Sequence, residues 1–469
     1  MRILHVVHGF PPIDRAGAET YTYQLCREQA KRHEVFVYTR TLDRAREQYD
    51  EYDELVDGIR VRRIVNNFSD LDSFEKDYIN RNVEMRFEKY LEELKPDIVH
   101  VQHMVGLSST IAHIVRKNGI PMVATVHDYW MICPRVQLVD AFGDICEGPR
   151  EGHRCTLICS TRFWAPSPVI TGTPLWRFLK KVTPQPVQRF IKYRILGAPR
   201  KPVMKIDGPA PVSPEERVAI PEDLFNIELM KYNFRVQSFR GILNKMDAVI
   251  APSEFVRRKF IDFGVYPDKV ATVYHGIPRN GLDRAKTPSG GKVRFGYLGT
   301  ILKHKGLDIL LDAFRSLPAG KAELHVHGFG IEGEEEYIRG LKGKVSGLEA
   351  YFHGPYNQED LPGVLSGIDV VVVPSTWYET FNIVAREAVL SGCPVIASAV
   401  GALPEFIEDG RNGFLFEPGN PSELALRMGR FIEEPDLLAN MRSGEAGIKD
   451  MTEHALEIES IYGSAVKGK

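Results

Sequence analysis

The sequence has few cysteines, no excess of either charge and no long apolar run. Its 469 residues include six cysteines, too few for a disulfide-held chain of this size, so a reducing compartment is expected. Sixty basic against 62 acidic residues give a net charge of −2, which provides no general attraction for nucleic acid. Runs of about 18 apolar residues are missing, and no signal-peptide pattern precedes the strand-like Ile3–Val7. We therefore expect a cytoplasmic protein without a membrane-spanning helix.

Short apolar runs alternate with amphipathic segments in both halves of the chain, which predicts an α/β protein with two doubly wound parallel sheets. The expected strands are 3–7, 34–38, 59–64, 98–101, 122–126 and 248–251, then 294–298, 323–327, 370–373, 394–397 and 413–416. The expected helices of the first half are 18–31, 81–94 and 108–117. The predicted domains are 1–277 and 293–450, with a linker rich in Gly, Pro and charge at 278–292 and a last helix within 451–469.

An insertion at about 152–234 interrupts this alternation. Residues 152–206 contain no Asp or Glu but eleven Arg or Lys, with aromatic residues between them. The amphipathic middle, 175–196, predicts peripheral contact with an anionic membrane, such as the inner face of the plasma membrane, or with an acidic partner. An ordinary insertion whose aromatic residues pack on their own domain is the alternative.

Two glutamates, Glu379 and Glu387, follow the buried-looking strand 368–373 and have seven residues between them. In an open α/β sheet, ligands bind at the carboxyl ends of strands, where helix N-termini present free N–H groups. A carboxylate in such a turn and a second one on the helix suit a polyhydroxyl ligand whose phosphates face the helix start. The alternative is an ordinary acidic helix start with a surface glutamate.

The segment Pro374–Ala388 resembles the two-glutamate signature of retaining, nucleotide-sugar-dependent glycosyltransferases with the GT-B fold, the large family four. The resemblance covers about 1–135 and 235–465 and is strongest over 296–405. It implies two Rossmann-like domains facing across a cleft, with the donor nucleotide on the second and the acceptor on the first. It also implies sugar transfer with retention to a glycan or lipid-linked acceptor, in surface polysaccharide or glycolipid synthesis, and a last helix that returns to the first domain.

The same resemblance assigns donor contacts in the second half. It implies that Glu379 faces the transferred sugar and Glu387 the ribose. The backbone amides at the helix start would cradle the diphosphate; they belong to Thr380, Phe381, Asn382 and Ile383. The family usually has Gly where Asn382 stands.

The turn Gly296–Gly306 carries the cations that a departing diphosphate needs. Lys305 matches the phosphate-binding lysine of the family. The family commonly has Arg at the position of Thr300, and Lys303 is a possible substitute for it. Gly328 lies in the glycine-bearing loop expected near the nucleotide. Taken alone, the G-x-G-x-x-G at 328–333 suggests a dinucleotide site, but the acid-rich 332–336 would repel a pyrophosphate.

Three residues of the first half are expected to contact the donor from the N-terminal side of the cleft: Gly17 by close approach to the donor phosphates, and His103 and His127 from the ends of two strands. Gly17 lies in a small-residue loop that resembles the Gly-Gly-Ala-Glu of the family, with Ala16 in place of the first Gly. His127 resembles the family histidine that contacts the donor sugar near the reacting carbon, and His103 holds a matching position after the strand 98–101. A flexible loop and two structural histidines are the alternative.

Four cysteines lie within 27 residues: Cys133, Cys146, Cys155 and Cys159. They would bind a structural zinc ion or, alternatively, be buried as free thiols. We expect no catalytic metal and no cofactor besides the donor. Two other functions stay open: a non-catalytic glycan-binding or partner-stabilising protein of this fold, and a sugar-nucleotide epimerase or hydrolase.

Overall fold

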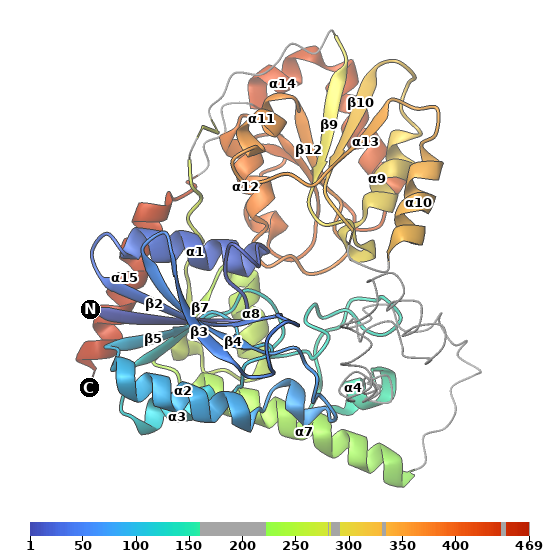
Figure 1. The fold of residues 1–469 in the computed structure, drawn as a ribbon. Helices are drawn as coiled ribbons and strands as arrows, with labels where there is room; N and C mark the ends of the chain where they lie inside the picture. Colours follow the sequence, from blue (N-terminus) through green and yellow to red (C-terminus); the bar gives the residue numbers. More distant parts are fainter. Residues whose placement is uncertain (160–221, 280, 283–290, 331–333, 442–446, 469) are drawn as a thin grey trace, which may run out of the picture. The chain divides into compact units, whose positions relative to one another are not determined.

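The computed structural model describes residues 1–159, 222–279, 281–282, 291–330, 334–441 and 447–468 (Figure 1). The described chain forms two compact units. Unit 1 contains the described residues of 1–251, 259–271 and 457–469, and unit 2 contains those of 252–258 and 272–456. The predicted membrane-contact segment 175–196 and most of the predicted linker 278–292 lie outside the described residues.

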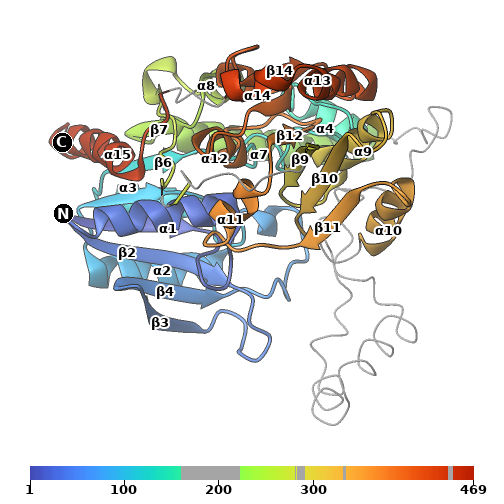
Figure 2. The same ribbon diagram turned by 90° about the horizontal axis from the view of Figure 1, so that it is seen from above.

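Unit 1 is built on an eight-stranded sheet with the order β3-β4-β2-β1-β5-β6-β7-β8. Its strands are β1 (Arg2–Val7), β2 (Glu34–Thr41), β3 (Glu51–Val56), β4 (Ile59–Val65), β5 (Ile98–Val101), β6 (Met122–Thr125), β7 (Ala248–Ala251) and β8 (Val270–Thr272). β1 pairs in parallel with both β2 and β5. β3 is antiparallel to β4 at one edge of the sheet, where Figure 2 shows it outside β4 and β2. All four residues of β5 are buried, as expected for a central parallel strand covered on both faces.

Helices cover both faces of this sheet. The helices of this part of the chain and the last helix are α1 (Gly17–Gln29), α2 (Arg81–Leu94), α3 (Ile111–Lys117), α4 (His153–Ile158), α7 (Glu222–Asn244), α8 (Glu254–Phe263) and α15 (Met451–Lys467), of which α8 and α15 are divided between the two units. Figure 1 shows α1 on one face and α2, α3 and α7 on the other. α2 begins at Asn80, whose side chain accepts hydrogen bonds from the amides of Asn82 and Val83 and so satisfies two free N–H groups of the first turn.

The C-terminal end of α15 belongs to unit 1. Tyr462 contributes its hydroxyl to buried hydrogen bonds with His100 and Gln29, at 2.6 and 3.2 Å. Glu459 pairs with Arg32 at 2.8 Å. These contacts attach the last turns of the chain to the core of the first sheet.

Unit 2 is built on a six-stranded sheet with the order β11-β10-β9-β12-β13-β14. The strands are β9 (Val293–Leu298), β10 (Ala322–His327), β11 (Ala350–Gly354), β12 (Val370–Val373), β13 (Val395–Ser398) and β14 (Gly413–Phe416). The helices are α9 (Leu307–Phe314), α10 (Glu335–Lys344), α11 (Leu361–Ser366), α12 (Ile383–Leu390), α13 (Pro421–Glu433) and α14 (Pro435–Met441). Apolar side chains of α9, α10 and α13 pack against the strands in one core, and α11 and α12 lie on the other face (Figure 1). The predicted class, α/β with two parallel sheets, is confirmed.

Each sheet has a point where the chain reverses its direction of progress. In unit 1 the chain moves from β1 outward to β2 and later continues on the other side of β1 with β5; in unit 2 it moves from β9 to β10 and later continues with β12. Such switch points place two loops apart at the carboxyl edge of the sheet and are where open α/β sheets bind ligands.

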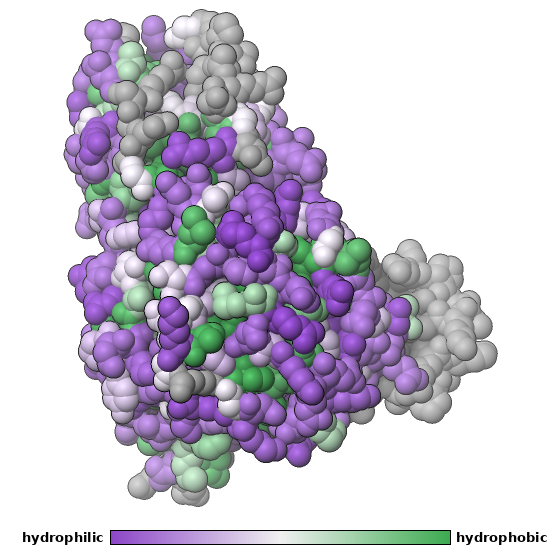
Figure 3. All heavy atoms as spheres, turned by 90° about the vertical axis from the view of Figure 1, so that its left-hand side faces the viewer, coloured by the Kyte–Doolittle hydropathy of each residue, from purple (hydrophilic) through white to green (hydrophobic). Residues whose placement is uncertain are grey.

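No helix in the described part of the chain is long and apolar enough to cross a membrane. The face drawn in Figure 3 is mainly hydrophilic, with several separate apolar patches.

Candidate functional site

A buried carboxylate and a lysine meet at the switch point of unit 2. Glu379, in the loop between β12 and α12, is 4% exposed. Its Oε1 accepts hydrogen bonds from Lys305 Nζ at 2.7 Å, Ser375 Oγ at 2.6 Å and Trp377 Nε1 at 2.8 Å. Burial would raise the pKa of Glu379, but the Lys305 charge and these donors outweigh it and lower the pKa. Glu379 is therefore an ionised carboxylate whose position is fixed by three hydrogen bonds.

Lys305 reaches Glu379 because the loop after β9 packs directly on the loop after β12. The next residue, Gly306, has a φ of 70°, and a Cβ there would lie 1.9 Å from the carbonyl oxygen of Pro374. Only glycine fits this contact, which explains the Lys-Gly pair of the sequence. Lys305 also lies 4.6 Å from the ring centre of Trp377, so two contacts orient its ammonium group.

The loops after β9 and β10 also touch. A Cβ at Gly328 would lie 1.9 Å from the carbonyl oxygen of Gly299, and the amide of Ile301 donates to the Phe329 carbonyl at 2.8 Å. Gly328 therefore lies beside the turn that carries Thr300 and Lys303. Lys303 is exposed, whereas the Thr300 carbonyl accepts a hydrogen bond from Tyr297 at 2.8 Å.

Asn382 begins helix α12 in a left-handed conformation, with φ 59° and ψ 82°. Its side chain accepts a hydrogen bond from the amide of Ala385 at 2.9 Å, which caps the helix. The family pattern has Gly here, and Asn is among the few other residues that adopt this conformation readily. The departure from the pattern therefore preserves the backbone turn at the helix start, where Thr380, Phe381 and Ile383 also lie.

The other predicted glutamate, Glu387, lies on α12 and is 3% exposed. Its Oε1 accepts a hydrogen bond from Gln358 Nε2 at 2.6 Å. Burial raises its pKa to about 7, against the opposing effect of this donor. The two glutamates thus differ: Glu379 is ionised by a nearby lysine, and Glu387 is close to half-protonated at neutral pH.

Sequence reasoning missed Arg386, which lies under the start of α12. The guanidinium is buried, donates to the carbonyl of Phe381 and stacks on the rings of Phe381 and Phe406, at 3.6 and 4.5 Å from their centres. Burial lowers its pKa to about 9, so it stays charged at neutral pH. A buried cation therefore adds to the positive potential of the helix N-terminus. An arginine on a helix carries no sequence signal for this position, because only the fold shows that it is buried.

In unit 1, the structure places His103 and Asp128 together. His103 Nε2 lies 3.1 Å from Asp128 Oδ2, and its Nδ1 accepts from the Val105 amide at 3.1 Å. These two contacts place the proton on Nε2. His103 follows β5, and its ring lies 4.3 Å from that of His8, which follows β1. The pair marks the switch point of the first sheet.

His127 follows β6 and is held through its ring. Its Nε2 lies 2.8 Å from the Gln102 side-chain oxygen, and its ring lies 4.8 Å from that of Tyr21. Burial lowers its pKa to about 3, despite the opposing charge of Asp128, so the imidazole is neutral. Gly17 is the first residue of α1, and a Cβ there would meet no described atom within 4 Å, so packing does not require glycine.

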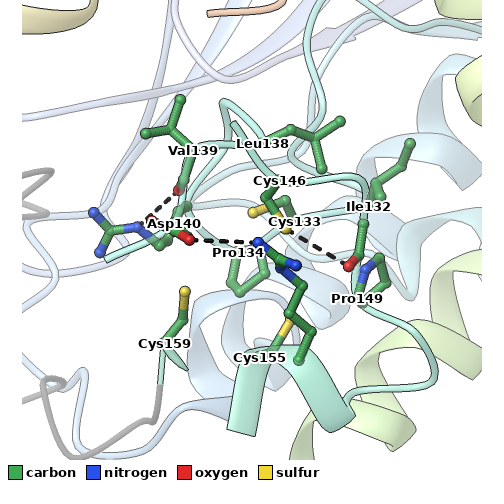
Figure 4. A pocket seen from close by; sticks show the side chains of 13 residues that line it. Ile132, Cys133, Pro134, Leu138, Val139, Asp140, Cys146, Pro149, Cys155 and Cys159 are labelled. Atoms are coloured by element: carbon green, nitrogen blue, oxygen red, sulfur yellow. Dashed lines mark hydrogen bonds and ion pairs between the residues drawn. The ribbon is translucent and has the colours of Figure 1, made fainter. Parts of the chain in front are cut away.

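The four clustered cysteines line one small cavity in unit 1, of about 10 Å³ (Figure 4). Burial raises the pKa of Cys155 and, to about 12, that of Cys159, which favours neutral thiols. Throughout the described ranges, no group of three or more His, Cys, Asp or Glu side chains is placed to hold a metal ion. The predicted structural zinc site is therefore unsupported.

The sequence also contains one Asp-x-Asp triplet, Asp70–Leu71–Asp72. Each of its two carboxylates has a partner within the protein. Asp70 accepts a hydrogen bond from the Tyr49 hydroxyl at 2.7 Å, and Asp72 pairs with Lys76 at 2.9 Å. These contacts support the loop after β4.

Comparison with known protein families identifies the family of this chain. A model described as "Glycosyltransferase Family 4" matches residues 15–191 and 222–280, half of the chain. The chain belongs to glycosyltransferase family 4. A second model, "Glycosyl transferases group 1", matches residues 280–447 of this family 4 chain.

Curated relatives match over parts of their length. A D-inositol 3-phosphate glycosyltransferase of Streptomyces scabiei is 32% identical over 203 residues, 38% of this chain and 44% of that protein. An uncharacterized 41.2 kDa protein in the cps region of Klebsiella pneumoniae is 29% identical over 208 residues, 42% of this chain and 56% of that protein. The chain thus spans about half the length of these relatives.

Solved structures show the fold. HepE from Anabaena, in complex with UDP, has a TM-score of 0.63 and 18% identity, with 99% of this chain and all of that chain covered. Sucrose-phosphate synthase from Thermosynechococcus elongatus has a TM-score of 0.64 and 18% identity, with both chains fully covered. The family 4 chain therefore has the GT-B fold, as the resemblance implied.

Proposed function

We propose that this chain transfers a sugar, with retention of its anomeric configuration, from a nucleoside diphosphate sugar to a glycan or lipid-linked acceptor. The observation that carries the proposal is the Glu379–Lys305 pair at the switch point of unit 2. Glu387 lies on α12, the helix that follows Glu379 in the chain. Family membership supports transfer, and the HepE structures in complex with UDP and with UDP-glucose support a UDP-sugar as donor.

In this proposal each site residue of unit 2 binds one part of the donor. The second carboxylate oxygen of Glu379 accepts hydrogen bonds from the sugar hydroxyls, since the three protein donors all reach Oε1. Lys305 and the amides at the start of α12, above buried Arg386, stabilise the diphosphate. Glu387 accepts hydrogen bonds from the ribose, and the exposed Lys303 is a further phosphate contact.

The chemical step is a front-face substitution. The bond between the anomeric carbon and the diphosphate oxygen breaks, and a bond from the acceptor oxygen to that carbon forms on the same face. The acceptor proton passes to the departing phosphate oxygen, so no protein base is required. Lys305 and the helix amides lower the barrier because negative charge grows on the diphosphate as the bond breaks. His127, neutral in this structure, would contact the sugar as a hydrogen-bonding group, and Gly17 would allow close approach of the phosphates.

The biological setting belongs to the proposal as well. A role in surface polysaccharide or glycolipid synthesis is supported by the relative in the cps region. Peripheral membrane contact through 175–196 stays a prediction from the basic and aromatic sequence alone.

Calorimetry with UDP, GDP, ADP and TDP tests the donor site on wild type, Lys305→Ala and, as a control, Lys321→Ala, which changes an exposed lysine of unit 2. We expect one diphosphate to bind wild type and the control and to lose affinity in Lys305→Ala. No binding by any diphosphate would contradict the proposal and favour a non-catalytic protein of this fold. Donor breakdown at the same rate with and without acceptors would favour a hydrolase or epimerase.

A further inference from the structure

Unit 1 carries a cluster of charged and polar side chains, one buried and three partly buried, that the proposed donor site does not use. Asp14 lies in the loop after β1, Glu19 in the first turn of α1 and Arg40 next to the last residue of β2. His8, which directly follows β1, completes the cluster. Five buried polar atoms of these four residues have no hydrogen-bond partner within the described chain. They are Asp14 Oδ2, Glu19 Oε2, His8 Nδ1, Arg40 Nε and the Arg40 NH1 nitrogen. Buried polar atoms are nearly always partnered, so such a concentration at the carboxyl edge of a sheet points to a ligand.

The protein holds these side chains in place without satisfying them. The Arg40 guanidinium lies 5.3 Å from the ring centre of Phe68, and a Cβ at Gly106 would lie 2.5 Å from Arg40 Cδ. Glu19, 5% exposed, is fixed through one oxygen by His8 Nε2 at 2.9 Å. Packing therefore sets the positions of the polar groups before any ligand binds.

Asp14 is held in the same way, by the loop that carries it. A Cβ at Gly9 would lie 2.8 Å from Asp14 Cβ, so the aspartate packs closely over a glycine backbone. Burial raises the pKa of Asp14, and Arg40 opposes this effect; burial lowers the pKa of Arg40, and Asp14 and Glu19 oppose that effect. The charges of Asp14, Glu19 and Arg40 therefore influence one another electrostatically.

The charge balance of the cluster decides what it would bind. Arg63, the other buried arginine nearby, pairs with Glu54 and donates to the carbonyls of Phe10 and Pro11. The Arg63 NH1 nitrogen is nevertheless buried without a partner, and its charge acts on Asp14. Three carboxylates, those of Asp14, Glu19 and Glu54, therefore stand against two guanidinium groups, which disfavours an anionic ligand. Hydroxyl groups suit the site, because a hydroxyl donates to a carboxylate oxygen and accepts from a guanidinium N–H.

We propose that Asp14, Glu19 and Arg40 bind uncharged, adjacent hydroxyl groups of the acceptor and select against phosphorylated acceptors. This inference rests on the proposed transferase function. It assigns to the acceptor a chemical class, a neutral polyhydroxyl compound, and to the three residues the role of determining specificity.

Binding measurements on the UDP-saturated full-length protein test it, with two matched pairs of probes. The first pair is myo-inositol and D-inositol 3-phosphate, and the second is glucose and glucose 6-phosphate. Saturation-transfer NMR detects the binding of each probe. We expect the neutral probe of a pair to bind wild type about fivefold or more tightly than its phosphate ester, because the two carboxylates repel the phosphate. Arg40→Met should weaken the neutral probe, and Asp14→Asn with Glu19→Gln should reduce or reverse the preference. Arg46→Met, which changes an exposed arginine of unit 1, is the control.

The outcomes separate this inference from the proposed function. If wild type binds no nucleoside diphosphate, the donor assignment fails. If a diphosphate binds but the phosphate esters bind as well as the neutral probes, the specificity assignment alone is wrong. The specificity assignment is equally wrong if neither class of probe binds or if the double variant leaves the ratio of affinities unchanged. Retained diphosphate binding in all three variants shows that each is folded.

Discussion

Lys305 and Glu379 pair at 2.7 Å across the switch point of the second sheet, although 73 residues separate them in the sequence. One follows β9 and the other follows β12, the two strands between which the chain reverses direction. Because Glu379 is buried, the lysine both keeps it ionised and is itself held beside the start of α12. A diphosphate arriving at that helix would find a cation already in position.

Replacing Glu379 by Gln should nearly abolish sugar transfer, while the fold and the binding of the nucleoside diphosphate stay unchanged. The amide retains a hydrogen-bonding oxygen but loses the charge that we propose orients the sugar, so we expect kcat to fall by about 100-fold or more. Glu323→Gln, which changes a carboxylate on β10 paired with Lys292, is the matched control. Wild-type kcat in Glu379→Gln would remove this residue from the site.

The stability of the ligand-free protein should depend on Glu387. Its pKa is about 7 in the folded protein against 4.5 as the reference value, so the folded state binds the proton more tightly. Between these two pH values the folded state carries more protons, and the free energy of unfolding therefore falls as the pH rises, by about 3 kcal/mol in total. The loss is completed as the pH rises through this folded-state pKa.

Glu387→Gln should abolish this dependence. We expect the variant to be more stable than wild type at about pH 8 and similar near pH 4.5, and to bind the nucleoside diphosphate less tightly. Urea unfolding of both proteins across this range measures the effect. Parallel curves for wild type and variant would show that Glu387 is not the titrating group.

Asn382 tests why an asparagine stands where the family has glycine. Both Asn382→Gly and Asn382→Ala remove the cap on the Ala385 amide, but only alanine must also adopt the left-handed φ of 59°. We therefore expect Asn382→Ala to be less stable than Asn382→Gly by about 1 kcal/mol or more. Chemical unfolding compares the two variants directly, and equal stability would contradict the conformational explanation.

The sequence predicted the parts of the fold whose signal is local. The apolar runs of β1, β5 and β12 stand out because both faces of a central parallel strand are buried. β3, β8 and β11 were not expected. β3 lies at an edge with alternating exposure, β8 has three residues, and the residues of β11 are at most half-buried, so none forms an apolar run.

The site divides in the same way. The two glutamates, Glu379 and Glu387, and the Lys-Gly pair could be identified in the sequence as candidate site residues, because each motif follows a recognisable strand. The burial of Arg386 and the cluster of Asp14, Glu19 and Arg40 depend on which loops the fold brings together, and neighbouring residues in the sequence do not indicate it. The cysteine spacing suggested zinc, but in the described part of the chain no three or more potential ligands are placed to hold a metal ion.

The measurement that tests the central claim most directly is a proton NMR time course of a UDP-sugar panel with wild-type enzyme and the hydroxyl-bearing acceptor probes. We predict release of UDP from one donor, dependence of that release on an acceptor, and a product with the anomeric configuration of the donor. Release of free sugar independent of acceptor, an inverted product, or no turnover of any donor would contradict the account.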